Sequence, residues 1–246
     1  WLIKKYNFLD KQQIQNLQKL KKKIIDNKNI TTKEFFLSLN FSNYESIDIN
    51  GAYGSLLYDL NFDLTEKYNF NRVYDFVINN GTGEHIFNQF SLLKNMHQLC
   101  KISGIMIHIL PFIDWINHGF YNFNPIFFAD LAASNNYDIV KMSLANRNGN
   151  EIVFDKNHYY RNYEQVKPHI KESFFAKVID LAKDKLKENI IIVCALKKLN
   201  KNKFKIPLQG KYIQDIESKN RKNKYKNQKS GSEIAINQVA DNKKRE

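Results

Sequence analysis

The sequence predicts an α/β fold in which a mostly parallel sheet carries helices on both faces. Two observations predict it. Short apolar runs typical of strands alternate with segments of helical periodicity, and the chain is 43% hydrophobic, with 18 Phe and 13 Tyr. That composition suffices for one core. We therefore expect a single domain over residues 1–199 and a flexible, disordered basic tail, rich in Lys and Asn, over residues 200–246.

The first part of the chain predicts two helices and a strand. Apolar residues recur every three or four positions across residues 10–25, and Asp10 is suited to cap the helix that they form. Thr31 and Glu34 have the spacing of a capping box, which predicts a second helix directly after Thr31. Residues 44–49 are then a short strand candidate with an acidic end.

The remainder of the domain alternates strands with helices. The run 74–79 has the apolar content of a strand buried on both faces, and the strand after it is introduced by Gly104 and ended by Pro111. Residues 145–167 are polar and irregular. Strands are expected at 74–79, 104–112, 137–144 and 189–196, and helices at 87–100, 125–134 and 171–186.

The net charge of +13 lies mainly near the end of the chain. Residues 197–246 hold 15 of the 38 Lys and Arg residues but only 5 of the 25 acidic ones. A solvated tail is the preferred interpretation, and nonspecific contact with nucleic acid or an anionic membrane is the disfavoured alternative. Cys100 and Cys194 suit buried thiols, and the sequence holds neither a long apolar run nor an export signal, so we expect a cytoplasmic protein without a membrane span.

Polar residues follow several of these strands, and ligands of parallel sheets bind at the carboxyl ends of strands. Asp48 ends the first strand, where it is placed to accept hydrogen bonds from ribose hydroxyls, and Asp59 is placed to meet an adenine amino group. Gly81 and Gly83 follow strand 74–79. A phosphate-binding G-x-G-x-x-G turn would follow the first strand of a dinucleotide fold, whereas this pair follows a later strand, after Asp48 and Asp59. We therefore expect the pair to let a ligand approach the backbone.

In order and spacing, these segments resemble the class I S-adenosylmethionine-dependent methyltransferases. The resemblance covers residues 40–145, with a looser match at 189–197. The matching segments are SIDI (46–49, ribose-binding strand), YDLNFDL (58–64, adenine-contacting motif), YDFVINNGTGEHIFN (74–88, fourth strand and loop), CKISGIMIHI (100–109, turn and fifth strand), NYDIVKMSL (136–144, sixth strand) and NIIIVCALKK (189–198, closing strand).

The resemblance implies a Rossmann-like sheet and methyl transfer from S-adenosyl-L-methionine to oxygen or nitrogen of a small-molecule or carbohydrate-like acceptor. Residues 1–43 contain no glycine, whereas the family's first strand ends in a glycine-rich loop. We expect that strand and loop to lie upstream of Trp1, and the alternative is a non-catalytic methyltransferase-like binding module with nucleic-acid contact through the basic tail. The resemblance implies cofactor binding by Asp48, Ile49, Asp59, Leu60, Asn79, Asn80 and Gly81.

Transfer to a hydroxyl or an amine requires a base, and three candidates lie near the ends of two strands. His118 is the preferred base, and Glu84 and His85 are further catalytic candidates, although these two also suit the start of a helix. His108 lies between isoleucines within a strand and is expected to be a core residue. Glu84, His85 and His118 lack the close sequence spacing of metal ligands, so the sequence predicts no metal site.

The loop between residues 112 and 124 is rich in aromatic residues. Such side chains are suited to line the pocket of a small-molecule or glycan acceptor, and they are equally suited to pack the loop onto the sheet. The residues concerned are Phe112, Trp115, Phe120, Tyr121 and Phe123.

Overall fold

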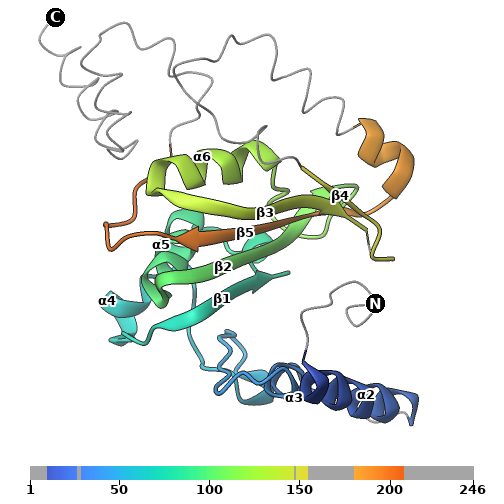
Figure 1. The fold of residues 1–246 in the computed structure, drawn as a ribbon. Helices are drawn as coiled ribbons and strands as arrows, with labels where there is room; N and C mark the ends of the chain where they lie inside the picture. The colour runs from blue at the N-terminus through green and yellow to red at the C-terminus, as the bar shows by residue number, and fades with distance from the viewer. Residues whose placement is uncertain (1–9, 27–28, 147, 155–179, 208–246) are drawn as a thin grey trace, which may run out of the picture. The chain divides into compact units, whose positions relative to one another are not determined.

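The computed structural model describes residues 10–26, 29–146, 148–154 and 180–207, drawn as coloured ribbon in Figure 1. The chain divides between Asp59 and Leu60 into two units, which we call the N-terminal unit (residues 1–59) and the sheet unit (residues 60–246). The first part of the helix expected at 171–186 and most of the expected tail lie outside the described residues.

The N-terminal unit contains the two helices that the sequence predicts. Helix α2 (Lys11–Ile25) begins with a capping box, because Asp10 Oδ1 accepts from the backbone N–H of Gln13 at 2.7 Å and the Gln13 side chain accepts from the Asp10 N–H at 3.0 Å. Helix α3 (Thr32–Ser38) begins with the same arrangement at Thr31. Both helix starts expected from the capping signals are confirmed.

The first strand expected from the sequence is absent from the described part of the N-terminal unit. Ile47 alone makes a β-bridge, with Leu56, and the chain turns between them through a short 3-10 helix, η1 (Ala52–Gly54). Asp48 Oδ1 accepts from Asn50 N at 2.9 Å. Such a bond from a side chain to the backbone two residues on competes with extended structure. Asp48 therefore lies in a turn, and the prediction of a strand end at this position is wrong.

The sheet unit is built on an open five-stranded sheet with the strand order β1-β2-β5-β3-β4 (Figure 1). Only the β1–β2 pair is parallel, and the other three neighbouring pairs are antiparallel. The expectation of a mostly parallel sheet is therefore wrong, because β5 runs in reverse between β2 and β3, and a short hairpin joins β3 to β4. The strands are β1 (Tyr74–Asn80), β2 (Cys100–Ile113), β3 (Tyr137–Ala145), β4 (Glu151–Val153) and β5 (Ile190–Lys198).

Two strand boundaries differ from those expected. β2 begins at Cys100, before Gly104, and it continues past Pro111 to Ile113 with a register shift at this point. A proline without an N–H group is tolerated at such an irregularity, so it does not end the strand. β4 lies in the region expected to be irregular, but its Ile152 and Val153 are β-branched residues that favour strands, and the segment pairs with β3.

The helices of the sheet unit connect its strands. α5 joins β1 to β2, and α6 joins β2 to β3. Both pack on the same face of the sheet. The His108 ring lies 5.1 Å from the Phe128 ring of α6, and a Cβ atom at Gly83 would contact both Asn79, which is paired with His108 on that face, and Leu92 of α5. The expectation of helices on both faces is wrong for these two helices. The elements are α4 (Leu64–Tyr68), η2 (Gly83–His85), α5 (Gln89–Leu99) and α6 (Pro125–Asn135), with residues 180–186 also helical.

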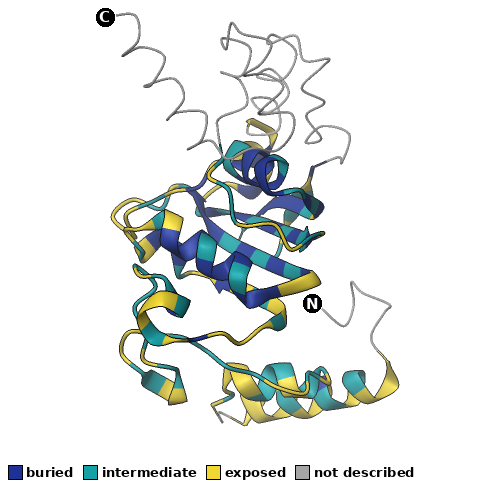
Figure 2. Ribbon diagram, turned by 90° about the vertical axis from the view of Figure 1, so that its left-hand side faces the viewer, coloured by how far each residue is buried: buried dark blue, intermediate teal, exposed yellow. Residues whose placement is uncertain are grey.

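The two faces of the sheet differ in burial. Ile192, Cys194 and Leu196 of β5 point to the face covered by α5 and α6 and are completely buried. On the opposite face Phe76 and Ile78 of β1 remain 42% and 40% exposed, so β1 is not buried on both faces as expected. Figure 2 shows the buried residues, in dark blue, concentrated in the sheet, α5 and α6. The core therefore lies between the sheet and one layer of helices.

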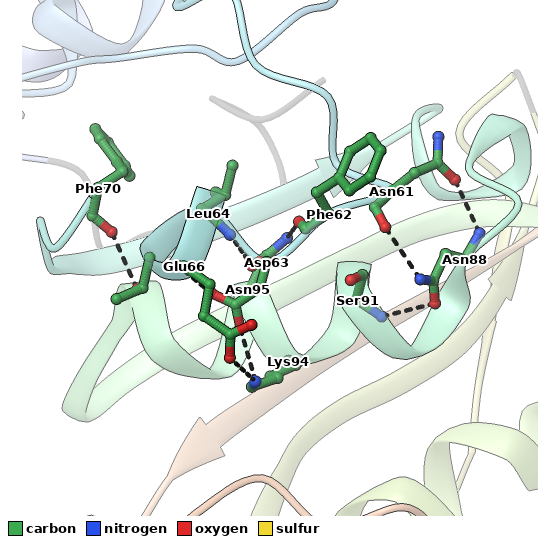
Figure 3. A network of polar contacts seen from close by, with 11 residues as sticks. Asn61, Phe62, Asp63, Leu64, Glu66, Phe70, Asn88, Ser91, Lys94 and Asn95 are labelled. Atoms are coloured by element: carbon green, nitrogen blue, oxygen red, sulfur yellow. Dashed lines mark hydrogen bonds and ion pairs between the residues drawn. The ribbon is translucent and has the colours of Figure 1, made fainter. Parts of the chain in front are cut away.

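A polar network attaches the segment before β1 to α5 (Figure 3). The buried Asn95 side chain accepts from Leu64 N at 2.9 Å and donates to Phe62 O at 2.8 Å. At the start of α5, Asn88 N donates to Asn61 Oδ1 at 2.9 Å, and the Asn88 side-chain amide donates to Asn61 O at 3.0 Å. These bonds hold α4 against α5 and fix the start of α5, which directly follows the η2 turn.

A second polar group, which we call the His97 cluster (His97, Tyr137, Lys198 and Asn202), lies at the amino ends of β2 and β3. His97 Nε2 donates to Asn202 O at 2.7 Å, so Nδ1 accepts from the Tyr137 hydroxyl at 2.6 Å. Lys198 Nζ donates to His97 O at 2.7 Å and to Cys100 O at 3.0 Å, which satisfies carbonyls at the end of α5. Burial lowers the pKa of His97 to about 4, and the Lys198 charge contributes.

The described chain beyond β5 also packs on the helices. Asn135 of α6 exchanges two hydrogen bonds with the Lys205 backbone, at 2.7 and 2.9 Å, and the Phe204 ring lies 5.8 Å from the Phe90 ring of α5. Phe204 and Lys205, which fall within the expected tail, thus pack on α5 and α6. No helix in the described part of the chain is long and apolar enough to cross a membrane.

Candidate functional site

The three catalytic candidates lie together beyond the carboxyl ends of β1 and β2, and we call them the Glu84 cluster (Glu84, His85 and His118). Glu84 is buried, at 1% exposure. Its Oε1 atom lies 3.3 Å from His118 Nε2 and 3.8 Å from His85 Nε2, and the two imidazole rings lie 5.1 Å apart. The fold therefore brings His118 to a carboxylate that precedes it by 34 residues.

The η2 turn directs the Glu84 side chain inward. Asn79, at the end of β1, accepts a hydrogen bond from Gly83 N at 2.8 Å. A Cβ atom at Gly83 would lie 2.6 Å from Asn79 Nδ2 and 3.1 Å from Leu92, so no larger residue fits this position without a shift of its neighbours. The small residue at Gly83 accommodates Asn79 rather than an approaching ligand. The turn is thereby held tightly at the point where the chain enters Glu84.

The loop after β2 covers Glu84 and supplies His118. Phe120 N and Tyr121 N both donate to Glu84 O, at 2.7 and 3.3 Å. A Cβ atom at Gly119 would lie 2.9 Å from Glu84 O and 3.0 Å from Glu84 Cγ, so glycine is required for this close passage. Gly119 was missed from the sequence, where its position beside His118 was the available signal. The loop and the buried carboxylate form one tightly packed arrangement.

Trp115 packs against His118. Its ring lies 4.8 Å from the His118 ring, and its indole N–H donates to Ile190 O at 3.0 Å, which anchors the loop to the start of β5. The other aromatic residues of the loop divide in two. Phe112 and Phe123 belong to the buried core, whereas Phe120 is 67% exposed. Packing of the loop onto the sheet therefore accounts for at least three of the five aromatic residues.

The Glu84 cluster combines a buried carboxylate with two accessible imidazoles. The His85 and His118 side chains are 47% and 39% exposed. Glu84 Oε2 is buried and accepts no hydrogen bond from any residue that the structure describes. Such a group is suited to accept a proton through a histidine that a carboxylate orients, or to bind a cation. We expected no metal site only because these three residues are not closely spaced along the chain. The fold brings their ligand atoms within 4.8 Å of one another.

The residues expected to bind the cofactor divide between the two units. Asp48 and Ile49 are exposed in the N-terminal unit, which also contains Asp59, whereas Leu60 begins the sheet unit. Asn80 and Gly81 follow at the carboxyl end of β1, where Asn80 is exposed and Gly81 N donates to Ile109 O at 3.1 Å.

Asn79 is buried and engaged within the protein. Besides its bond to Gly83, its side-chain amide lies 3.4 Å from His108 Nδ1. His108 is 1% exposed, and burial lowers its pKa to about 3. Neutral His108 therefore accepts from Asn79, and its expected place in the core is confirmed. Asn79 therefore positions the η2 turn through its hydrogen bond to Gly83 N.

Comparison with known proteins gives no indication of function, so the geometry of the site is the basis for the proposal below. No protein-family model matches the chain, no curated protein is similar to it, and no solved structure matches its fold.

Proposed function

We propose that the chain is a class I S-adenosylmethionine-dependent methyltransferase that acts on oxygen or nitrogen of a small-molecule or carbohydrate-like acceptor. The observation that carries the proposal is the strand order. The segments that resemble the family's fourth, fifth, sixth and closing strands are β1, β2, β3 and β5, and β5 lies in reverse between β2 and β3. β1, β2 and β3 therefore run in one direction, as the strands of a Rossmann-like sheet do.

The location of the Glu84 cluster supports the same proposal. Ligands of α/β sheets bind beyond the carboxyl ends of the parallel strands, and the cluster follows β1 and β2 at that edge. The cofactor supplies an electrophilic methyl group, so the protein has to position the acceptor and receive its proton. His118 receives the proton from the acceptor, and Glu84, at 3.3 Å, orients the imidazole and stabilises its charged form.

The residues expected to hold S-adenosylmethionine fit it in part. Asp48 has an exposed carboxylate, the group that binds ribose hydroxyls, and Asn80 and Gly81 lie at the open end of β1. Asn79 does not fit, because its side chain is buried and bonded within the protein. Within the sheet unit we therefore assign the cofactor to Leu60, Asn80 and Gly81, and a structural role to Asn79. For Asp48, Ile49 and Asp59 of the N-terminal unit, cofactor binding stays a prediction from the resemblance.

Titration calorimetry of the full-length protein with S-adenosylmethionine and with its demethylated product tests the proposal. We expect both to bind, and Asp48→Ala to weaken binding by more than about tenfold, because a charge-assisted hydrogen bond to a ribose hydroxyl is lost. Asp26→Ala, which removes another exposed carboxylate of the N-terminal unit, is the matched control and should bind like the parent. Absence of binding by both compounds would reject the enzyme and favour the non-catalytic binding module.

A further inference from the structure

We infer that the Glu84 cluster is a binding site for a divalent transition-metal ion of the Zn²⁺ class. Glu84, His85 and His118 each offer one ligand atom, and the three atoms lie within 4.8 Å of one another. Zinc bonds to carboxylate oxygen and imidazole nitrogen are about 2.0–2.2 Å long, so tetrahedral ligand atoms lie about 3.4 Å apart. Glu84 Oε1 and His118 Nε2 already have this spacing, at 3.3 Å.

The third ligand reaches the same spacing with little movement. His85 Nε2 lies 3.8 Å from Glu84 Oε1, and the side chain is 47% exposed, so rotation of the imidazole meets no packed core. The carboxylate, in contrast, is held in place, because Phe120 N and Tyr121 N bind the Glu84 backbone and Gly119 lies against its side chain. Glu84 is thus a rigid ligand, and the exposed side chains of His85 and His118 can adjust to the ion.

The uncompensated oxygen of Glu84 is an independent indication of a cationic ligand. Oε2 is buried without a hydrogen bond from any described residue, and a buried carboxylate oxygen without a partner is costly. Across the described residues, the groups within salt-bridge distance of this carboxylate are the two histidines, which bear a positive charge only when protonated. A divalent cation on Oε1 compensates the buried carboxylate whether or not the imidazoles are protonated.

The ligand types select the metal. Two imidazoles and one carboxylate suit Zn²⁺ or another first-row transition ion, whereas Mg²⁺ and Ca²⁺ prefer sites made of oxygen. Three protein ligands leave one coordination position, and the exposure of both histidines places it toward solvent. An acceptor hydroxyl bound there would be acidified by the ion in place of an imidazole base. This last step rests on the proposed methyl transfer, but metal binding itself does not.

Metal binding by the full chain, with any affinity tag removed, tests the site. We expect equilibrium dialysis to detect one Zn²⁺ per chain, and Co²⁺ to give a visible absorption band that Zn²⁺ abolishes. Glu84→Gln, His85→Asn and His118→Asn should each weaken Zn²⁺ binding by at least about tenfold, since each removes one of three ligands. Circular dichroism of each variant verifies that the fold is retained.

Two controls make the test decisive. Glu66→Gln and Asp75→Asn change exposed carboxylates of the sheet unit outside the cluster and should leave Zn²⁺ affinity unchanged. Unchanged affinity in all three cluster variants, or a parent protein that binds Zn²⁺ no better than the His85→Asn/His118→Asn double variant, would overturn the site. S-adenosylmethionine binding, measured in the same protein with a chelator present, separates this outcome from failure of the proposed methyl transfer.

Discussion

The Glu84 cluster and the His97 cluster lie near the two ends of α5, and each combines histidine with a buried charged group. In the His97 cluster, both ring nitrogens of His97 and the Lys198 ammonium make hydrogen bonds of 2.6–3.0 Å. In the Glu84 cluster, one carboxylate oxygen has no partner among the described residues, and both histidines reach solvent. Similar residue types are therefore used in opposite ways.

The difference separates stability from function. A buried polar network with all its partners stabilises one packing arrangement and leaves nothing with which to bind a ligand. A buried carboxylate oxygen that lacks a partner lowers stability, and proteins retain such groups where the cost serves binding or catalysis. We therefore expect changes in the His97 cluster to alter stability, and changes in the Glu84 cluster to alter ligand binding.

The largest effect on stability is expected for Lys198→Met, which keeps the aliphatic stem but removes the ammonium. The carbonyls of His97 and Cys100 then lose their donor at the end of α5, in a place that water does not reach. We expect the free energy of unfolding to fall by about 3 kcal/mol. Urea denaturation followed by circular dichroism measures this change.

Lys197→Met is the matched control for that change. Lys197 precedes Lys198 in β5 and points to the opposite, less buried face, so its replacement should alter the free energy of unfolding by less than about 0.5 kcal/mol. An equal loss in the two variants would show that the charge itself, and not the helix-capping contact, accounts for the effect.

Acid is expected to destabilise the protein through its buried histidines. Burial lowers the pKa of His97 to about 4, against the ordinary value of 6.5, so between these pH values the unfolded chain binds a proton that the folded chain does not. Stability is therefore highest above pH 6.5 and falls as the pH decreases toward 4. At pH 4.5 the loss from His97 alone is about 2 to 3 kcal/mol relative to pH 7.

His97→Gln tests the origin of this acid sensitivity. A glutamine has one acceptor and one donor, which suit Tyr137 and Asn202, but it does not titrate. The free energies of unfolding of parent and variant, measured from pH 7 to pH 4.5, should converge as the pH falls. A difference in the free energy of unfolding that stays constant across this range would mean that another group takes up the proton. His108, whose pKa is also lowered, is then the group to replace.

Among the residues of the two clusters, the smallest effect on stability is expected for Glu84→Gln, although the residue is buried to 1% exposure. The amide keeps the shape of the side chain and is easier to bury than a charged group, so in metal-free protein we expect stability to rise by up to about 1 kcal/mol. Thermal denaturation in a chelating buffer measures the difference. A loss of more than 1 kcal/mol would mean that the carboxylate is structural, and the contrast between the two clusters would fail.

Much of the local structure could be predicted from residues close in sequence. The capping boxes at Asp10 and Thr31 depend on residues within one helical turn, and both helices begin where these signals place them. The apolar runs located β1, β2, β3 and β5. The strand expected before residue 50 failed because local hydrogen bonds of Asp48 and Asn50 form a turn, and the pairing of this segment in the described part of the chain is a single bridge to Leu56.

The candidate site was visible only as separate residues. Glu84, His85 and His118 stood out in the sequence, but the supporting roles of Asn79 and Gly119 could not be read there, because each depends on contact with a distant part of the chain. The strand directions were hidden for the same reason: an apolar run has the same composition whichever way it enters a sheet.

By itself, the sequence determined where helices begin, which runs become strands, and which polar residues follow them, because these properties depend on neighbours a few positions away. Only the tertiary structure decided that β5 runs in reverse between β2 and β3, that α5 and α6 share one face, and that His118 meets Glu84. These features arise from pairing and packing between segments tens of residues apart, whose free energy no local pattern records.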